Sequence, residues 1–296
     1  MSDAFAAADR FLLNDARLLE RRLFATIFLG QPASHVADAL SGYQNDDGGF
    51  GHALEPDKRC PLSLPVDVEV AFQALAATGA PAPGDMLGRA CDFLAETAAK
   101  ADAGGGVPLA FPVIEQFPRA AHWTDWTYQP GLNPTAGLTG LLYRLGFDHP
   151  WRSAGAAYCW DRLETGYVPG DGHELSEVLT FLENAPQRDR ADRVADALRG
   201  SLGDIAMFSL DPEAEGYGVT PLDVAPEADS RWRSLFTSEQ IEGHLGRLAA
   251  SQQDDGGWPI AWEPPGEGAV CEWRGIVTLK ALRTLVSHGR LTPPAK

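Results

Sequence analysis

A glycine-rich segment occurs twice in this chain, and the duplication constrains the fold more than any other feature of the sequence. The first copy, QNDDGGF, occupies residues 44–50, and the second, QQDDGGW, occupies residues 252–258. The copies start 208 residues apart, which equals four units of about fifty residues. A degenerate third copy, EGYG, occupies residues 215–218. The sequence therefore predicts an architecture built from repeated units.

The residue types in the two copies indicate a structural turn at the end of a helix. Gln and Asp side chains can satisfy free backbone amides and carbonyls there, and the paired glycines permit left-handed backbone and close packing. The aromatic residues, Phe50 and Trp258, are expected to fill the space between neighbouring helical hairpins. The Asp pairs at 46–47 and 254–255 are accordingly interpreted as structural rather than catalytic.

Helical periodicity extends along most of the chain, with capping residues and prolines at the expected helix starts. The expected helices cover residues 4–29, 34–43, 65–78, 85–99, 135–145, 150–164, 172–184, 188–202, 238–250 and 273–287. Short extended pieces are expected at 107–113 and near Tyr217. Connections alternate between brief ones and long ones rich in Gly, Pro and Trp. This pattern predicts an all-α chain of paired helices, which we assign to a single domain spanning residues 1–296.

The net charge of -17 and the isoelectric point near 4.7 exclude several kinds of partner. A nucleic-acid groove needs clustered Lys and Arg, so no nucleic-acid partner is expected. No apolar run reaches the roughly 18 residues that a transmembrane helix needs, so no integral membrane segment is expected. An anionic substrate would require a local basic pocket or a bridging divalent cation.

The four cysteines indicate the compartment. They are widely scattered, form no Cys-x-x-Cys pair, and follow no secretory signal. Reduced thiols and a cytoplasmic location are therefore expected. The sequence specifies no oligomeric state.

The duplicated Gln-x-x-Asp-Gly-Gly-aromatic motif resembles the QW-type repeat of squalene and oxidosqualene cyclases. It also resembles the glycine-rich turns of protein prenyltransferase β subunits. Residues 49–65, 132–151 and 252–285 further resemble single-barrel bacterial proteins described as prenyltransferase-like or squalene-cyclase-like. The resemblance to this terpenoid cyclase and prenyltransferase superfamily implies a single α/α toroid, a barrel of about six helical hairpins, with a mostly apolar central cavity.

The catalytic signatures of the resembled families are missing from the chain. Gln44 and Gln252 stand where the first Asp of the class II Asp-x-Asp-Asp motif would lie. The Asp-Asp-x-x-Asp motif of class I synthases is absent, and Ala269 replaces the Asp of the Asp-x-Cys zinc motif before Cys271. We therefore predict no metal site and no certain cofactor, although a diphosphate substrate would bring Mg²⁺ with it.

Glu55 and Asp57 are the candidate catalytic residues. They flank Pro56 in a long loop that follows the first glycine turn. Two carboxylates in a rigid loop could act as acid and base or bind a cation. Alternatively, the carboxylates brace the loop by accepting backbone N–H bonds. The neighbouring Lys58 and Arg59 could pair with them or with an anionic ligand.

The candidate substrate-binding residues fall into an aromatic group and a polar group. Aromatic faces can stabilise a carbocation, so Trp126, Trp262 and Trp273 are expected as cavity walls, with packing between hairpins as the alternative. The polar candidates are Asn133, His173, Glu177 and Arg274.

Each polar candidate has a structural alternative. His173 and Glu177 share a helix face and could meet on one ligand, or form an ordinary pair or half of a metal site. Arg274 could hold a phosphate or carboxylate, or form a brace with Glu272. Asn133, before Pro134, also reads as a helix N-cap.

The leading functional hypothesis is a terpene-cyclase-like or prenyl-substrate enzyme that acts on a hydrophobic small molecule. One alternative is a non-catalytic module that binds a hydrophobic ligand or a protein partner, which the missing catalytic motifs favour. Another is a carbohydrate-active lyase or hydrolase, since α/α toroids also serve sugars. An open site with exposed Trp rings and two carboxylates would favour a sugar, whereas a closed apolar cavity with one acid would favour an isoprenoid.

Overall fold

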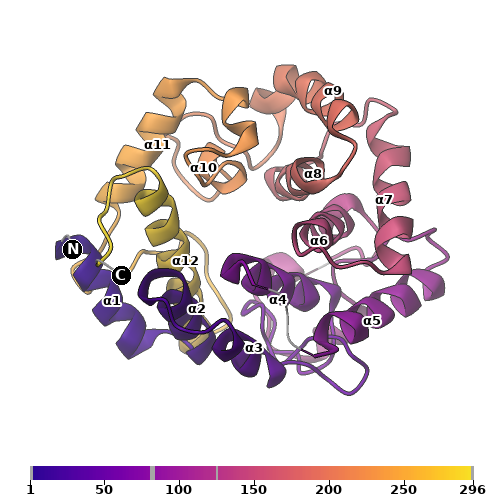
Figure 1. The fold of residues 1–296 in the computed structure, drawn as a ribbon, viewed down its shortest axis with the longest axis horizontal. Helices are drawn as coiled ribbons and strands as arrows, with labels where there is room; N and C mark the ends of the chain where they lie inside the picture. The colour runs from indigo at the N-terminus through magenta and orange to yellow at the C-terminus, as the bar shows by residue number, and fades with distance from the viewer. Residues whose placement is uncertain (1–2, 81–83, 125, 295–296) are drawn as a thin grey trace.

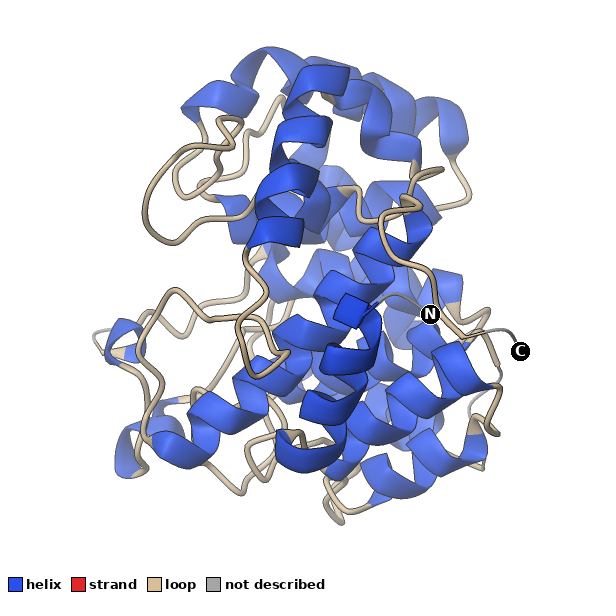
Figure 2. Ribbon diagram, turned by 90° about the vertical axis from the view of Figure 1, so that its left-hand side faces the viewer, coloured by secondary structure: helices blue, strands red, loops and turns tan. Residues whose placement is uncertain are grey.

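The computed structural model describes residues 3–80, 84–124 and 126–294, and within these ranges it confirms the predicted all-α class. Figure 2 shows helices joined by loops. The α-helices are α1 Asp3–Asp15, α2 Leu18–Leu29, α3 Ser34–Ser41, α4 Pro65–Thr78, α5 Met86–Lys100, α6 Leu132–Arg144, α7 Pro150–Leu163, α8 Gly172–Asn184, α9 Arg188–Leu198, α10 Pro221–Val224, α11 Ser238–Ala250 and α12 Glu267–Ser287. The 3-10 helices are η1 Pro112–Gln116, η2 Ala121–Trp123, η3 Arg199–Asp204 and η4 Arg231–Leu235.

The helices follow one another around a ring, as Figure 1 shows. The even-numbered helices lie nearer the centre, and the odd-numbered helices lie outside them. Helix α4 packs on α2 and α6, and α8 packs on α6 and α10. An ion pair of 2.5 Å between Lys280 and Asp223 joins α12 to α10. Helix α1 packs on α12, so the two ends of the chain meet.

Loop length alternates along the chain in step with this arrangement. The loops that lead from an outer to an inner helix include the long segments 42–64, 101–131, 205–220 and 251–266. Most return connections from an inner to an outer helix are shorter, as at 30–33 and 185–187. The exceptions are the return connection 225–237, which contains η4, and the brief forward connection 16–17. Because inner and outer helices alternate, the inner helices run in one direction, and the long loops gather at their N-terminal end.

Three helix predictions need correction. The helix expected over residues 4–29 is broken, because Arg17 adopts an extended conformation with φ -60° and ψ 163°. The last helix begins at Glu267 rather than at 273, directly after Gly266 at φ 111°. The short helix α10 was not predicted, since four residues are too few to display helical periodicity.

The two glycine-rich turns make matching contacts. The Gln44 side-chain amide donates to the carbonyl of Met86 on α5 (2.9 Å), and the Gln252 amide donates to the carbonyl of Ala4 on α1 (2.8 Å). Each amide also donates to a glycine carbonyl of its own turn at 2.9 Å. Both glutamines therefore tie a turn to a neighbouring outer helix.

The glycines and aspartates of these turns have equally specific roles. Gly48 and Gly256 have positive φ, and a Cβ atom at either would lie within 2.4 Å of a backbone oxygen of the neighbouring helix. The carboxylates of Asp47 and Asp255 accept the N–H of the second glycine at 3.0 and 2.9 Å. These contacts agree with a structural rather than catalytic interpretation of both Asp pairs.

The inner helices α4 and α6 are buried on nearly all sides. Burial on α4 includes two carboxyl groups, since Asp67 is 1% exposed and Glu69 is 5% exposed. The sequence places both residues in the first turn, where the helix dipole favours acids at the surface. Their burial results from the packing of the ring. It places two buried carboxyl groups at the N-terminal end of the inner helices, where the long loops lie.

Candidate active site

The long loops at the N-terminal end of the inner helices bind one another through their backbones. Within them, Ala120 donates its N–H to the carbonyl of Asp57 at 2.8 Å, and Arg59 donates to the carbonyl of Pro118 at 2.9 Å. These bonds fix the loop 42–64 against the loop 101–131. They hold the side chain of Asp57 at the centre of the loop cluster.

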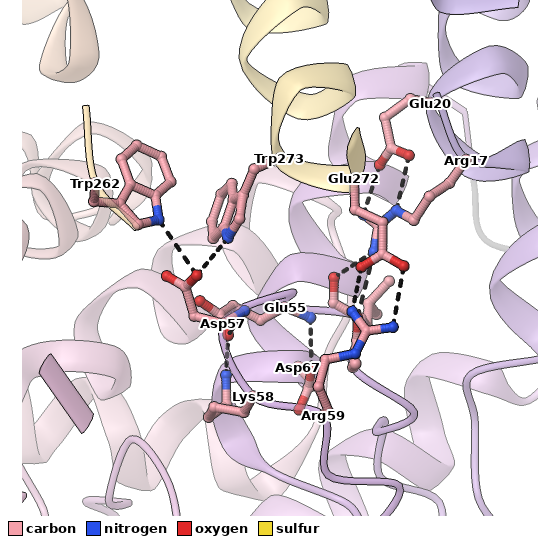
Figure 3. Close-up of polar contacts among 12 residues, drawn as sticks. Arg17, Glu20, Glu55, Asp57, Lys58, Arg59, Asp67, Trp262, Glu272 and Trp273 are labelled. Atoms are coloured by element: carbon pink, nitrogen blue, oxygen red, sulfur yellow. Dashed lines mark hydrogen bonds and ion pairs between the residues drawn. The ribbon is translucent and has the colours of Figure 1, made fainter. Parts of the chain in front are cut away.

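Asp57 lies between two tryptophan side chains that come from the far end of the chain (Figure 3). Its Oδ1 accepts a hydrogen bond of 2.8 Å from the Trp273 indole and one of 3.3 Å from the Trp262 indole. The residue is 3% exposed. Burial raises the pKa of Asp57 to about 6, and Glu55 adds to the rise, while the two indole donors oppose it.

The rings around Asp57 present aromatic faces at right angles. Trp262 and Trp273 have centroids 4.9 Å apart at an interplanar angle of 82°, and Tyr217 meets Trp262 edge-on at 5.3 Å. Tyr217 stacks on His173 of α8, and its hydroxyl lies 3.0 Å from Nε2 of that histidine. The tryptophans are half-buried and Tyr217 is exposed, so part of each face is free to receive a ligand.

His122 completes this group, and sequence reasoning missed it as a site residue. Its Nε2 lies 3.5 Å from Oδ2 of Asp57, and half of its side chain is exposed. Partial burial lowers the pKa of His122, Glu55 opposes the shift, and Lys58 and His173 lower the pKa further, which favours the neutral imidazole. The only signal in the sequence was its place in a tryptophan-rich loop. The name "Asp57 site" below denotes Asp57, His122, His173, Tyr217, Trp262 and Trp273.

Glu55 lies beside the Asp57 site, but its carboxylate is engaged within its own loop. It forms an ion pair with Lys58 and accepts the Asp57 N–H at 3.1 Å. The N–H of Glu55 donates to Asp67 at 2.6 Å. Lys58 is 1% exposed, and its ammonium lies 4.8 Å from the centroid of the Trp123 ring. These contacts correspond to the loop-brace alternative for Glu55.

Glu177 forms a separate carboxyl pair with Glu69, deeper in the ring. Glu69 belongs to α4 and Glu177 to α8, and both carboxyl groups lie over Gly137 of α6. Burial raises the pKa of both acids, and the neighbouring carboxyl raises that of Glu177 further, which favours the protonated form. Glu177 therefore does not meet His173 on a common partner, although the two lie one turn apart on α8.

Arg274 also lies apart from the Asp57 site. Its guanidinium donates to the Asp255 carboxylate at 2.7 and 2.8 Å and to the Gln253 side chain at 2.7 Å. It packs over the ring of Phe11. Arg274 thus braces the second glycine turn, whereas Glu272, its expected partner, pairs with Arg59.

The two remaining candidates lie near the loop cluster. Trp126 packs against Trp123 with centroids 4.8 Å apart and is half-buried. Asn133 lies in the first turn of α6 with extended backbone at φ -89° and ψ 114°. The helix N-cap predicted at Asn133 is at Gly131 instead.

Two cavities among the described residues lie on the surface away from the Asp57 site. The larger has a volume of about 640 Å³ and borders the first glycine turn and α5. Its lining residues are Asn45, Asp46, Asp47, Leu62, Ser63, Phe93, Thr97, Lys100, Phe111 and Val113. None of the predicted site residues lines it.

Three further features of the described residues concern metal binding, membrane-spanning helices and the cysteine thiols. No cluster of three or more His, Cys, Asp or Glu side chains could hold a metal ion in the part of the chain that the structure describes. No described helix is long and apolar enough to cross a membrane. The four cysteines, Cys60, Cys91, Cys159 and Cys271, are free thiols. In comparisons with known proteins, no protein-family model and no curated protein sequence matches this chain.

Proposed function

We propose that the chain is a single α/α toroid and that its Asp57 site is the active site of a carbohydrate-active hydrolase. The toroid proposal rests on the alternation of inner and outer helices, on the contact between α1 and α12, and on the matching glycine turns. The functional proposal rests on one observation, the buried Asp57 carboxyl held between two perpendicular indole rings.

The protonation of Asp57 suits acid–base chemistry. With a pKa of about 6, the carboxyl is protonated in a useful fraction of molecules near neutral pH and can donate a proton to a leaving oxygen. His122 lies next to this carboxyl, with Nε2 3.5 Å from Oδ2 and half of its side chain exposed, and its lowered pKa favours the neutral imidazole. In the proposed hydrolysis, Asp57 protonates the leaving oxygen as the glycosidic bond breaks. A water molecule forms the new bond to the anomeric carbon, and the neutral imidazole of His122 accepts the proton of that water.

The surroundings favour a neutral, polyhydroxylated ligand over an apolar or anionic one. Half-buried aromatic faces suit the apolar face of a sugar ring. The inner helices also carry polar side chains, which suit a polyhydroxylated ligand better than an apolar one: Glu69, Glu177, Asp223 and Lys280. The net charge of -17 disfavours a diphosphate or a uronate. Arg274, the expected anion ligand, is committed to Asp255.

A terpenoid or prenyl substrate remains the second candidate. The perpendicular faces of Trp262 and Trp273 could stabilise a carbocation, and a hydrocarbon such as squalene requires no basic pocket. For that substrate, Asp57 would protonate a carbon–carbon double bond. A carboxyl with a pKa of about 6 is a weak acid for that step, which places this candidate second.

A substrate panel tests the proposal. The protein and D57N are incubated with neutral, amino and uronic oligosaccharides, with squalene, and with prenyl diphosphates in the presence and absence of Mg²⁺. New reducing ends that depend on Asp57 and carry no new conjugated double bond support a hydrolase, whereas new conjugated double bonds indicate a lyase and contradict the proposal. Cyclised hydrocarbon products support the second candidate. Ligand binding without turnover supports a binding module and contradicts the enzymatic proposal.

A further inference from the structure

Two consecutive residues of α12 contact two residues of the Asp57 loop. The Glu272 carboxylate accepts two hydrogen bonds from the Arg59 guanidinium, at 2.5 and 3.2 Å. Next to it, the Trp273 indole donates to Asp57 at 2.8 Å. Figure 3 shows both contacts at the same turn of α12. A bidentate pair fixes orientation as well as distance, so the first contact sets the geometry of the second.

A second arginine fastens the same loop. Arg17, at the start of α2, donates to the carbonyl of Leu54 at 2.9 Å. Its remaining nitrogens bind the Glu20 carboxylate at 2.7 and 2.9 Å. The loop is therefore held between α2 and α12, the inner helices that flank the meeting point of the chain ends. The ion pair between Arg59 and Glu272 ties this loop to α12 itself, beside the Trp273 contact.

We propose that Arg59 and Glu272 are positioning residues, which hold Asp57 in register with the Trp273 indole. Neither residue is placed against a ligand. The inference rests on the proposed role of Asp57 for its catalytic meaning, but the register itself is a property of the folded protein. Loss of either partner should release the loop from α12 and weaken the hydrogen bond that Trp273 donates to the carboxylate.

The pair could change the titration midpoint of Asp57 through charge or through positioning. For the removal of Glu272, these two effects shift the midpoint in opposite directions. By charge alone, removing Arg59 would raise the titration midpoint of Asp57, and removing Glu272 would lower it. By positioning, both changes raise it, because the carboxylate loses its indole donor in either case. The other titratable or charged groups facing Asp57 are Glu55, Lys58, His122 and Tyr217. All of them stay in place in these variants.

The test is a pH titration of tryptophan fluorescence without substrate. The transition that disappears in D57N reports Asp57, because the indoles of Trp262 and Trp273 contact its carboxylate. The variants are R59Q, E272Q and R59Q/E272Q, with W273F as the reference for a lost indole donor. E242Q is the matched control, since it removes another ion pair between separate elements, that of Glu242 with Arg290. Circular dichroism establishes that each variant is folded.

Both single variants should raise the Asp57 midpoint by about one pH unit, in the direction of W273F. The double variant should shift no further than either single one, because the two residues act as a unit. E242Q should leave the midpoint unchanged. Opposite shifts in R59Q and E272Q, or no shift in either, would overturn the proposal. The titration uses no substrate, so it tests the positioning inference independently of the proposed function. If the midpoint shifts as expected but no sugar is turned over, the proposed function is contradicted and the positioning inference is still supported.

Discussion

The indole N–H of Trp273 donates a hydrogen bond of 2.8 Å to the carboxylate of Asp57, across 216 positions of sequence. The bond joins a loop near the start of the chain to the last helix. It stabilises the charged form of a carboxyl group that burial otherwise keeps protonated. The acidity of Asp57 therefore depends on how the first and last parts of the chain are packed together.

The first prediction concerns the pH dependence of activity. A general acid works in its protonated form, so kcat/KM should fall as pH rises through about 6, the pKa of Asp57. W273F removes a donor to the carboxylate, so the fall should move to higher pH. D57N should lower kcat by about 10²-fold to 10⁴-fold. A pH–rate profile on the substrate found by the panel checks this, and an identical profile in W273F would contradict it.

The second prediction concerns Asp67 and the pH dependence of stability. Burial raises the pKa of Asp67 to about 7, above the value near 3.9 expected in the unfolded chain. The folded state thus holds a proton that the unfolded state has lost, and stability falls as pH rises from 4 to 7. Between pH 5 and 7 this contributes up to about 3 kcal/mol.

D67N removes that titration, so urea denaturation should show a smaller loss of stability between pH 5 and pH 7 than in the wild type. The side-chain carbonyl that this substitution introduces can still accept the Glu55 N–H, which Asp67 accepts at 2.6 Å. An equal loss in D67N and wild type would mean that Asp67 is not the group responsible.

The third prediction concerns Gly137 beneath the Glu69–Glu177 pair. A Cβ at Gly137 would lie 1.5 Å from Oε2 of Glu177, so G137A should destabilise the protein by about 1–3 kcal/mol. In an open helix the same change stabilises by about 0.5–1 kcal/mol. A Cβ added at Gly246 of α11 would meet no atom within 4 Å, so G246A is the control.

A double-mutant cycle with E177A tests the cause of the G137A effect. Truncating Glu177 removes the shortest contact and leaves only that with Glu69 Oε1 at 2.7 Å, so G137A should cost less in the E177A background. Thermal or urea denaturation gives the four free energies of unfolding. If the cost is the same in both backgrounds, the Glu177 carboxyl does not lie over Gly137.

The fourth prediction concerns the contact between the chain ends. The Gln252 amide bonds the carbonyls of Ala4 and Gly256, so Q252A should destabilise by about 1–3 kcal/mol and expose amides of α1 to hydrogen exchange. Q44A removes the same bonds from the first turn and should expose α5 instead. If both variants instead increased amide exchange in one and the same helix, each glutamine would not stabilise the helix that it contacts, and the prediction would be contradicted.

Most of the helices could be predicted from the sequence, because amphipathic periodicity and helix caps are local signals. The breaks at Arg17 and the early start of α12 could not, since they depend on contacts outside each segment. Arg17 is extended where its side chain reaches the carbonyl of Leu54, and α12 begins directly after Gly266, ahead of the residues Glu272 and Trp273 that contact the loop 42–64. The tertiary structure decided these boundaries.

The candidate site divides along the same line. Asp57, Trp262 and Trp273 were candidates by residue type, and their catalytic and binding roles remain predictions. Their proximity is a tertiary property, because no local rule pairs residues more than 200 positions apart. His122 was missed, since nothing near it in the sequence distinguishes a histidine beside a carboxylate from one in solvent.

The sequence by itself determined the helical class and the two glycine-rich turns, because these follow from backbone conformation and neighbouring residues. Only the tertiary structure decided which carboxyl groups are buried and which of them have partners. Glu55 forms an ion pair with Lys58, Glu177 lies beside Glu69 with its pKa raised, and Asp57 accepts hydrogen bonds from two indoles. The acidity of a carboxyl depends on its desolvation and on the charges around it, and both are set by groups that the fold brings from distant positions.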